Sequence, residues 1–261
     1  MNISGNTILI TGGGSGIGLA LAEEFKKLGN VVIVAGRSQA KLEEAASKGL
    51  NTLTVDMTDL NSIDAMAAQA ITLFPNLNVV IHNAGVMKNE KIISQNNSQI
   101  AAETIATNLT GPIQLTNALI PHFLSQKSAA IITVTSGLAY VPLAMTPTYS
   151  ATKAAIHSYT QSLRYQLQDT PIKVKELVPP YVRTALMGSR QAEDGNAMPL
   201  EDFVAEVMSI LRDQPTTEQI LVKRVQPQRY SASEGEAKYK EFFQKQNDML
   251  MNARKKEWDA L

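Results

Sequence analysis

Cysteine is absent from the 261-residue sequence. This absence excludes disulfides, thiolate nucleophiles and cysteine-ligated zinc together. Histidine is scarce as well, and His82, His122 and His157 lack the spacing of metal-binding residues. We interpret each of these histidines as a structural residue, and we expect a protein without a metal site.

The sequence has no excess of either charge, because 24 Lys and Arg residues balance 24 Asp and Glu residues. Such a chain has no overall electrostatic field that would hold a nucleic acid or an anionic membrane. No signal peptide precedes the first strand-like segment, and no hydrophobic run approaches the ~20 residues that span a bilayer. We therefore expect a cytoplasmic protein whose partner is a small molecule.

Hydrophobic residues make up 44% of the sequence, enough to bury a large core. Several of the strand-like segments are continuously apolar, which is typical of parallel strands covered on both faces. Helical patterns separate these segments, so we predict an α/β fold of the Rossmann type, a doubly wound parallel sheet with helices on both faces. The seven predicted strands are residues 7–11, 31–35, 51–55, 78–82, 130–135, 173–178 and 219–224.

The sequence contains no internal repeat, no low-complexity region and no Gly/Ser linker. We therefore predict that residues 1–261 form one dinucleotide-binding domain. Within it, residues 186–215 form a candidate substrate loop, whose polar, glycine-containing part at 188–200 is expected to be mobile. Residues 233–261 are predicted to form a helical tail that covers the domain or meets a partner chain.

A glycine-rich segment, TGGGSGIG at residues 11–18, joins the first predicted strand to a helix that begins near Ile17. Glycines let the backbone turn tightly and approach a pyrophosphate, which N–H groups at the helix N-terminus then hold. Because the segment lies in a strand–loop–helix unit, it predicts a dinucleotide site. Its candidate cofactor-binding residues are Gly12, Gly14, Ser15, Gly16, Ile17 and Gly18.

The second predicted strand ends in AGRS, so Arg37 and Ser38 stand where an NAD site usually has an acidic residue. A carboxylate would repel a ribose 2′-phosphate, whereas a guanidinium can pair with it and stack on adenine. NADP(H) is therefore favoured, and NAD(H) is the alternative. Arg37 could instead only cap a loop, and Ser38 suits the N-cap of the next helix under either interpretation.

The segment TPTYSATKAA, residues 146–155, predicts a helix that runs to about Asp169, with Thr146 as its N-cap. Helical periodicity places Tyr149 and Lys153 on the same face as the apolar stripe. An ammonium group near a core-facing stripe must find partners or lose its proton, unless the side chain reaches outward to solvent. The spacing therefore favours a ligand for Lys153.

Two further positions are candidates for the site. Asn108 lies four residues before Pro112 in a predicted helix, and proline has no N–H to donate, so the carbonyl of residue 108 is expected to be free at a kink. We expect that carbonyl to hold a water, and a kink that serves packing alone is the alternative. Ser136 follows a predicted strand at the sheet edge where α/β folds bind ligands, either as a turn residue or as a donor to substrate.

The glycine loop, Asn108, Ser136 and the Tyr149-x-x-x-Lys153 pair, in this order, resemble the short-chain dehydrogenase/reductase (SDR) family. The resemblance covers residues 5–185. The segments HNAG at 82–85 and VPPYVRT at 178–184 are further similar to the DltE-like branch of the family.

This resemblance implies a nicotinamide-dependent enzyme with Asn108, Ser136, Tyr149 and Lys153 as its catalytic tetrad. In such a tetrad, Tyr149 donates a proton to a ketone oxygen or removes it in the oxidative direction. The charge of Lys153 stabilises the phenolate, and its amine holds the nicotinamide ribose together with Tyr149. Ser136 orients the carbonyl, and the water at Asn108 passes protons to Lys153.

The resemblance also implies further cofactor contacts and a homodimer or homotetramer. Asp56 is expected to contact adenine, and the residues that follow the fourth predicted strand are expected to line the adenosine side. The residues after the sixth strand are expected to flank the nicotinamide. These additional candidates are Asp56, Met57, Asn83, Ala84, Gly85, Pro179, Val182 and Thr184.

We therefore predict an NADP(H)-dependent oxidoreductase of the carbonyl reductase type that acts on a ketone or secondary alcohol. The alternatives are an NAD(H)-dependent alcohol dehydrogenase of the same fold and a non-catalytic protein that senses the cofactor. An apolar or aromatic ketone, or a β-keto ester, suits the residues that flank the predicted site, although each of them could instead be core. These residues are Leu138, Tyr140, Val141, Met145, Tyr181, Leu186 and Met187.

Overall fold

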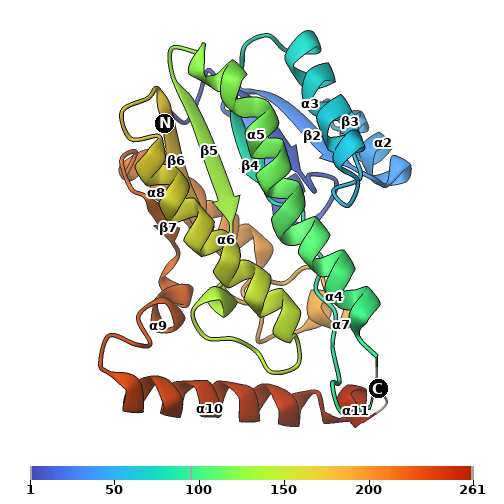
Figure 1. Ribbon diagram of the computed structural model, residues 1–261, viewed down its shortest axis with the longest axis vertical. Coiled ribbons are helices and arrows are strands. Elements are labelled where there is room, and N and C mark those ends of the chain that lie inside the picture. Colours follow the sequence, from blue (N-terminus) through green and yellow to red (C-terminus); the bar gives the residue numbers. More distant parts are fainter. Residues whose placement is uncertain (1, 95, 260–261) are drawn as a thin grey trace.

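The computed structural model describes residues 2–94 and 96–259. Its strands form one parallel sheet in the order β3-β2-β1-β4-β5-β6-β7 (Figure 1). The order runs outward in opposite directions from β1 and β4, which is the doubly wound arrangement. The predicted α/β fold with a seven-stranded parallel sheet is therefore confirmed. The strands are β1 (Thr7–Thr11), β2 (Val31–Gly36), β3 (Asn51–Thr54), β4 (Leu77–His82), β5 (Ala129–Val134), β6 (Ile172–Val178) and β7 (Gln219–Leu221).

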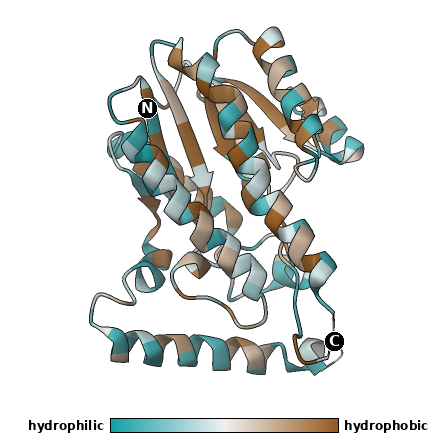
Figure 2. Cartoon of the chain, viewed as in Figure 1, coloured by the Kyte–Doolittle hydropathy of each residue, from teal (hydrophilic) through white to brown (hydrophobic). Residues whose placement is uncertain are grey.

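Helices cover both faces of the sheet, and alternate residues of β1 enter two separate cores. Ile8 and Ile10 pack with α1, α2 and α8, whereas Leu9 packs with α3, α5 and α6. Figure 2 shows the hydrophobic strands between helices that carry many hydrophilic residues. These helices are α1 (Gly16–Lys27), α2 (Gln39–Ser47), α8 (Leu200–Asp213), α3 (Leu60–Leu73), α5 (Gly111–Leu124) and α6 (Pro147–Gln166).

The seventh strand is shorter than the predicted range of 219–224, because β7 ends at Leu221. The chain then forms a 3₁₀ turn, η3 (Lys223–Val225), in which the N–H of Val225 donates to the carbonyl of Val222 at 3.1 Å. Both valines are fully buried. Residues three apart point to opposite sides of a strand but to the same side of a 3₁₀ turn, so the turn lets both valines reach the core.

The C-terminal tail runs across one end of the molecule as α10 (Glu236–Ala253) and α11 (Lys255–Asp259) (Figure 1). The Asn247 side chain accepts a hydrogen bond from the N–H of Ala144 and donates to the carbonyl of Pro142, at 2.6 and 3.1 Å. The predicted helical tail therefore exists and contacts its own chain, and a contact with a partner chain stays a prediction. Residues 260–261 of the predicted tail lie outside the described residues.

Among residues 2–94 and 96–259, no helix has the length and apolar character needed to cross a membrane. The same residues contain no group of three or more His, Asp or Glu side chains that could hold a metal ion. His82 and His122 instead form hydrogen bonds with the Thr116 hydroxyl and the Leu77 carbonyl, both at 2.9 Å.

Candidate active site

Two adjoining cavities, of about 350 and 220 Å³, lie at the carboxyl ends of the strands. They share Gly12, Ser15, Lys41, Ala84 and Gly85, so they form one groove across the edge of the sheet. The groove lies where β1 and β4 meet and the strand order reverses, which is where doubly wound sheets bind ligands.

The glycine loop is packed tightly against the end of β4. The side-chain amide of Asn83 donates to the carbonyls of Thr11 and Gly12 at 3.1 and 3.2 Å. Gly12 has a φ of +66°, and a Cβ atom there would lie 2.7 Å from the Cα of Ala84. Only glycine fits this position, so the backbone can turn tightly here. The loop then leads into the N-terminus of α1 beside the groove.

Two cations lie at the end of the groove near β2. Arg37 is 64% exposed, and its guanidinium lies 3.7 Å from the carboxylate of Glu103. The amine of Lys41, on α2, donates to the Ser15 hydroxyl at 3.4 Å. Both cations line the 220 Å³ cavity. Sequence reasoning missed Lys41, because only the folded chain brings the first turn of α2 beside the glycine loop.

Two predicted cofactor residues near these cations have clear local roles. Ser38 occupies the N-cap position of α2, as predicted, although its side chain forms no capping hydrogen bond. Asp56 accepts hydrogen bonds from the N–H and hydroxyl of Thr58 at 2.9 and 2.8 Å. The backbone bond from Thr58 is the largest cause of a pKa for Asp56 below the usual value. Both residues line the 220 Å³ cavity, and the contact of Asp56 with adenine stays a prediction.

The helix that carries the tyrosine and lysine starts at Pro147, as predicted, but its N-terminus is capped by another segment. Thr146 occupies the N-cap position, yet its buried hydroxyl has no hydrogen-bond partner in the described part of the chain. Glu90 instead accepts from the N–H and the hydroxyl of Thr148, at 3.0 and 2.6 Å. Thr146 therefore occupies the predicted N-cap position without a capping side-chain bond, and the helix ends at Gln166, slightly before the predicted Asp169.

Replacing Glu90 with alanine is expected to lower the free energy of unfolding by about 2 kcal/mol, because the Thr148 N–H would lose its acceptor at the helix N-terminus. Chemical denaturation measures this change. Glu234→Ala, at an exposed position, is the control and should leave stability unchanged. Equal stability of the two variants would show that Glu90 does not stabilise α6.

Tyr149 and Lys153 are both buried, with 7% and 5% of their surfaces exposed. Burial raises the pKa of Tyr149 to about 12, against a smaller lowering by a hydrogen bond with Ser136. Burial lowers the pKa of Lys153 to about 8. The lysine amine donates to the carbonyl of Val134 at 2.8 Å and lies 5.5 Å from the centre of the Tyr149 ring. Lys153 thus points inward, and the alternative of a side chain reaching solvent is wrong.

Ser136 lies directly after β5 and is the N-cap of the 3₁₀ turn η2 (Gly137–Ala139). Its hydroxyl oxygen accepts from the N–H of Leu138 at 3.1 Å, which fixes the side-chain rotamer. The hydroxyl can still donate to another oxygen. Ser136, Tyr149 and Lys153 line the 350 Å³ cavity together.

Asn108 is buried and, unlike these three residues, lines neither of the two cavities. The kink expected near Pro112 takes the form of a wide π turn, η1 (Ala106–Thr110), which follows α4 (Ser98–Ile105). The side-chain amide of Asn108 donates to the carbonyl of Val86 and accepts from its N–H, both at 2.9 Å. It also donates to the Thr152 hydroxyl at 3.2 Å. The water at the Asn108 carbonyl stays a prediction.

The fold brings almost all of the remaining sequence-predicted residues into the groove. Gly18 is the exception, because it lies within α1 beneath the glycine loop and lines neither cavity. The predicted residues that line the 350 Å³ cavity are Gly12, Ser15, Gly16, Ile17, Asn83, Ala84, Gly85, Ser136, Tyr149, Lys153, Pro179, Val182 and Thr184. Those that line the 220 Å³ cavity are Gly12, Gly14, Ser15, Arg37, Ser38, Asp56, Met57, Ala84 and Gly85.

Gln191 is a second cavity residue that sequence reasoning missed. It lies on α7 (Ser189–Glu193), within the candidate substrate loop, and is 6% exposed. Its amide donates to the carbonyl of Val182 and the hydroxyl of Thr184 at 2.8 and 3.2 Å. Gln191 therefore supports the segment after β6, and a glutamine in a polar segment gives no sequence signal for this role.

The apolar residues expected to flank the substrate are mostly elsewhere. Leu186 lines the 350 Å³ cavity, and both Leu186 and Met187 line a neighbouring cavity of about 410 Å³. Val141 and Met145 are fully buried, and the Tyr140 hydroxyl donates to Glu176 inside the protein. The core alternative therefore applies to these last three residues.

A groove with a buried tyrosine–lysine pair at one end and two cations at the other has the features of a dinucleotide-dependent oxidoreductase. A family model described as short chain dehydrogenase matches residues 6–195. The chain therefore belongs to the short-chain dehydrogenase/reductase family and is an oxidoreductase of that family.

Bacterial relatives support this assignment. The chain is 42% identical over 199 residues to the uncharacterized oxidoreductase DltE of Bacillus subtilis, an alignment that covers 75% of this chain and 79% of the relative. It is 34% identical over 182 residues to an uncharacterized oxidoreductase of Staphylococcus epidermidis, which covers 68% and 78% of the two chains.

Solved structures show the same fold. A short chain dehydrogenase from Burkholderia cenocepacia in complex with NADP has a TM-score of 0.78 at 22% identity and covers 89% of this chain and 94% of its own. A short chain dehydrogenase/reductase from Burkholderia phymatum in complex with NAD has the same TM-score at 19% identity and covers 89% and 95%. At these identities the likeness establishes the fold.

Proposed function

We propose that this protein transfers a hydride between NADP(H) and a ketone or secondary alcohol, with Asn108, Ser136, Tyr149 and Lys153 as its tetrad. The observation that carries the proposal is the burial of Tyr149, Lys153 and Ser136 around one cavity that continues to the glycine loop. We further propose that residues 1–261 act as one domain. Of the candidate substrate loop at 186–215, we propose that the part before α8 contacts the substrate, because Leu200–Asp213 forms α8 and packs in the core.

The groove suits a dinucleotide, because its N–H-rich glycine loop opens α1, which has no acidic residue in its first turn. We propose that the cavity-lining residues named above hold the cofactor, with phosphates at the loop and the nicotinamide ribose near Tyr149 and Lys153. When bound, the nicotinamide would supply or accept the hydride.

In this proposal, Ser136 donates to the carbonyl oxygen of the substrate and orients it. Tyr149 gives its phenol proton to the same oxygen as the hydride arrives at the carbon. The ammonium group of Lys153 then stabilises the phenolate that remains, and this offsets the rise in the pKa of Tyr149 that burial causes. Asn108 holds the Val86 segment against the helix that carries these groups through its bonds to Val86 and to Thr152.

Support for NADP(H) over NAD(H) comes from the cations at the β2 end of the groove. Arg37 and Lys41 line the cavity there, and the end of β2 carries no carboxylate that would repel a 2′-phosphate. Glu103 lies beside Arg37, so the guanidinium would have to exchange part of this ion pair for the phosphate. The lysine has no carboxylate partner among its hydrogen bonds and ion pairs with the described residues.

The double variant Arg37→Ala/Lys41→Ala is therefore expected to raise KM for NADPH about 100-fold, since two charge-assisted bonds to the phosphate would be lost. The KM for NADH, which lacks this phosphate, should change less than threefold. Lys127→Ala, at an exposed position, serves as the control. A wild-type preference for NADH would contradict the NADP(H) proposal and favour the NAD(H)-dependent alternative.

Initial rates with NADPH and NADH on a panel of apolar and aromatic ketones and β-keto esters test the proposed reaction. Turnover of one of these substrates is the expected result. Saturable cofactor binding without turnover of any carbonyl or alcohol would support the cofactor sensor instead. Gel filtration with light scattering tests the homodimer or homotetramer that we propose from family membership.

A further inference from the structure

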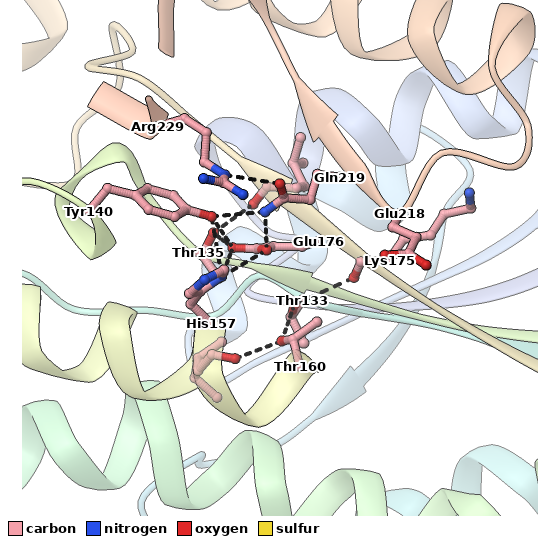
Figure 3. Close-up of polar contacts among 12 residues, drawn as sticks. Thr133, Thr135, Tyr140, His157, Thr160, Lys175, Glu176, Glu218, Gln219 and Arg229 are labelled. Carbon is pink, nitrogen blue, oxygen red and sulfur yellow. Dashed lines mark hydrogen bonds and ion pairs between the residues drawn. The ribbon is translucent and has the colours of Figure 1, made fainter. Parts of the chain in front are cut away.

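A buried carboxylate lies at the centre of a polar network beside the proposed tetrad (Figure 3). Glu176, on β6, is fully buried. Its Oε1 atom accepts from the Thr135 hydroxyl at 2.7 Å and from the Tyr140 hydroxyl at 3.2 Å. Its Oε2 atom accepts from the Gln219 amide at 2.7 Å, and Nδ1 of His157 lies 2.9 Å from both carboxylate oxygens.

The hydrogen bonds determine the charge and the tautomer in this network. Burial alone would raise the pKa of Glu176, but hydrogen bonds from His157, Gln219 and Thr135 outweigh it and leave the pKa below the usual value. Glu176 is therefore a carboxylate and can only accept hydrogen bonds. His157 must consequently carry a proton on Nδ1. Every bond to the carboxylate is then charge-assisted, which makes the network rigid.

Two of the four partners of Glu176 flank the proposed catalytic serine in the segment between β5 and α6, and the other two lie on α6 and β7. Thr135 directly precedes Ser136, and Tyr140 directly follows the turn η2. His157 lies one helical turn after Lys153 on α6. One carboxylate therefore fixes the segment that carries Ser136 to the helix that carries Tyr149 and Lys153.

The outer side of the network is closed by the C-terminal part of the chain. Arg229, the last residue of α9 (Gln226–Arg229), has its guanidinium 4.8 Å from the centre of the Tyr140 ring. Its Nε atom donates to the Gln219 amide oxygen at 3.0 Å. Tyr140 thus contacts Arg229 through its ring and Glu176 through its hydroxyl, and these two contacts hold the end of the Ser136 segment.

We propose that Glu176 is a positioning residue that acts through Thr135, Tyr140 and His157 to set the place of Ser136 relative to Tyr149. Glu176, His157 and Tyr140 do not line the 350 Å³ cavity, whereas Thr135 does, so the carboxylate acts on the site only through its partners. The role rests on the proposed function, because it concerns the place of Ser136 beside Tyr149 in the cavity. Ser136 lowers the pKa of Tyr149 through its side chain, so a displaced serine should leave a phenol that is harder to ionise.

Two threonines of the same strand region provide a matched test. Thr135 and Thr133 are two residues apart and each is 1% exposed. The Thr135 hydroxyl donates to Glu176, whereas the Thr133 hydroxyl forms a hydrogen bond of 2.8 Å with the Thr160 hydroxyl. Valine has nearly the shape of threonine, so each substitution removes one buried hydroxyl. Thr135 also lines the 350 Å³ cavity and Thr133 does not, so Tyr140→Phe, at a partner of Glu176 outside the cavity, separates the bond to Glu176 from contact with the cavity.

Thr135→Val is expected to lower kcat for ketone reduction about tenfold, with KM for NADPH changed less than twofold, because only the alignment of Ser136 is lost. In the alcohol-oxidation direction, the pKa seen in the pH profile of kcat/KM should move upward. Thr133→Val should keep kcat within twofold and leave the pH profile unchanged. Thr135→Ser, which retains the hydroxyl, should recover most of kcat.

Equal kinetics and pH profiles for Thr135→Val and Thr133→Val would overturn the proposal, as would a Thr135→Ser variant as impaired as Thr135→Val. If Thr135→Val does not fold, Tyr140→Phe takes its place, because it removes another bond to Glu176 and keeps the ring beneath Arg229. Its kcat, KM for NADPH and pH profile are then compared with those of Thr133→Val. Absence of turnover by the wild-type protein would overturn the proposed function itself, and this inference with it.

Discussion

Replacing Tyr149 with phenylalanine is expected to lower kcat for ketone reduction about 1,000-fold, because the variant has no phenol proton to give to the substrate oxygen. Phenylalanine fills the same buried space, so the fold and the groove should be retained. The dissociation constant of NADPH should change less than threefold. Initial rates and cofactor titrations measure the two effects.

Tyr165→Phe is the matched control, since Tyr165 lies on the same helix but is 74% exposed. This variant should keep wild-type kcat. A Tyr149→Phe variant that retained a tenth or more of the wild-type kcat would contradict the role of Tyr149 as the general acid. It would leave the cofactor groove and the family membership intact.

Replacing Lys153 with methionine is expected to lower kcat/KM for ketone reduction by about 1,000-fold and to remove a pH dependence. The pKa of Lys153 is lowered by burial to about 8, so the amine is protonated below pH 8 and neutral above it. Reduction needs the ammonium form to stabilise the phenolate. The wild-type rate should therefore fall as the pH rises through about 8, whereas the residual rate of the variant should not.

Profiles of kcat/KM between pH 6 and 10 provide the measurement. Lys173→Met, which removes an exposed lysine of β6, should retain both the wild-type rate and the fall near pH 8. A Lys153→Met variant that kept the same fall would show that another group titrates there. The proposed stabilisation of the phenolate by Lys153 would then be wrong.

The sheet and the glycine loop were predictable because their signals are local. Apolar runs separated by helical patterns define the strands, and all seven lie within one or two residues of the predicted ranges except for the end of β7. Tyr149 and Lys153 share one helix face at a spacing of four, so their common environment also follows from the sequence. These predictions need no knowledge of how distant segments meet.

The groups that support the site depend on distant contacts and were not predictable. The segment KVKELV predicts a strand, but nothing in it shows that Glu176 is fully buried, because its partners His157, Thr135 and Gln219 lie 19, 41 and 43 positions away. The capping of Thr148 by Glu90 spans 58 positions in the same way. A buried charge can be recognised only when its partners are known.

The π turn at Ala106–Thr110 has the effect of one extra residue inserted into a regular helix. Each helical residue rotates the next by about 100°, so the segments before and after the turn are out of phase with a single continuous helix. This offset lets Asn108 hold Val86 while Leu115 and Leu119 still point into the core. Deleting one residue here would give a more regular helix, but it would rotate α5 relative to Asn108. Either the core contacts of α5 or the hydrogen bonds between Asn108 and Val86 would then be lost.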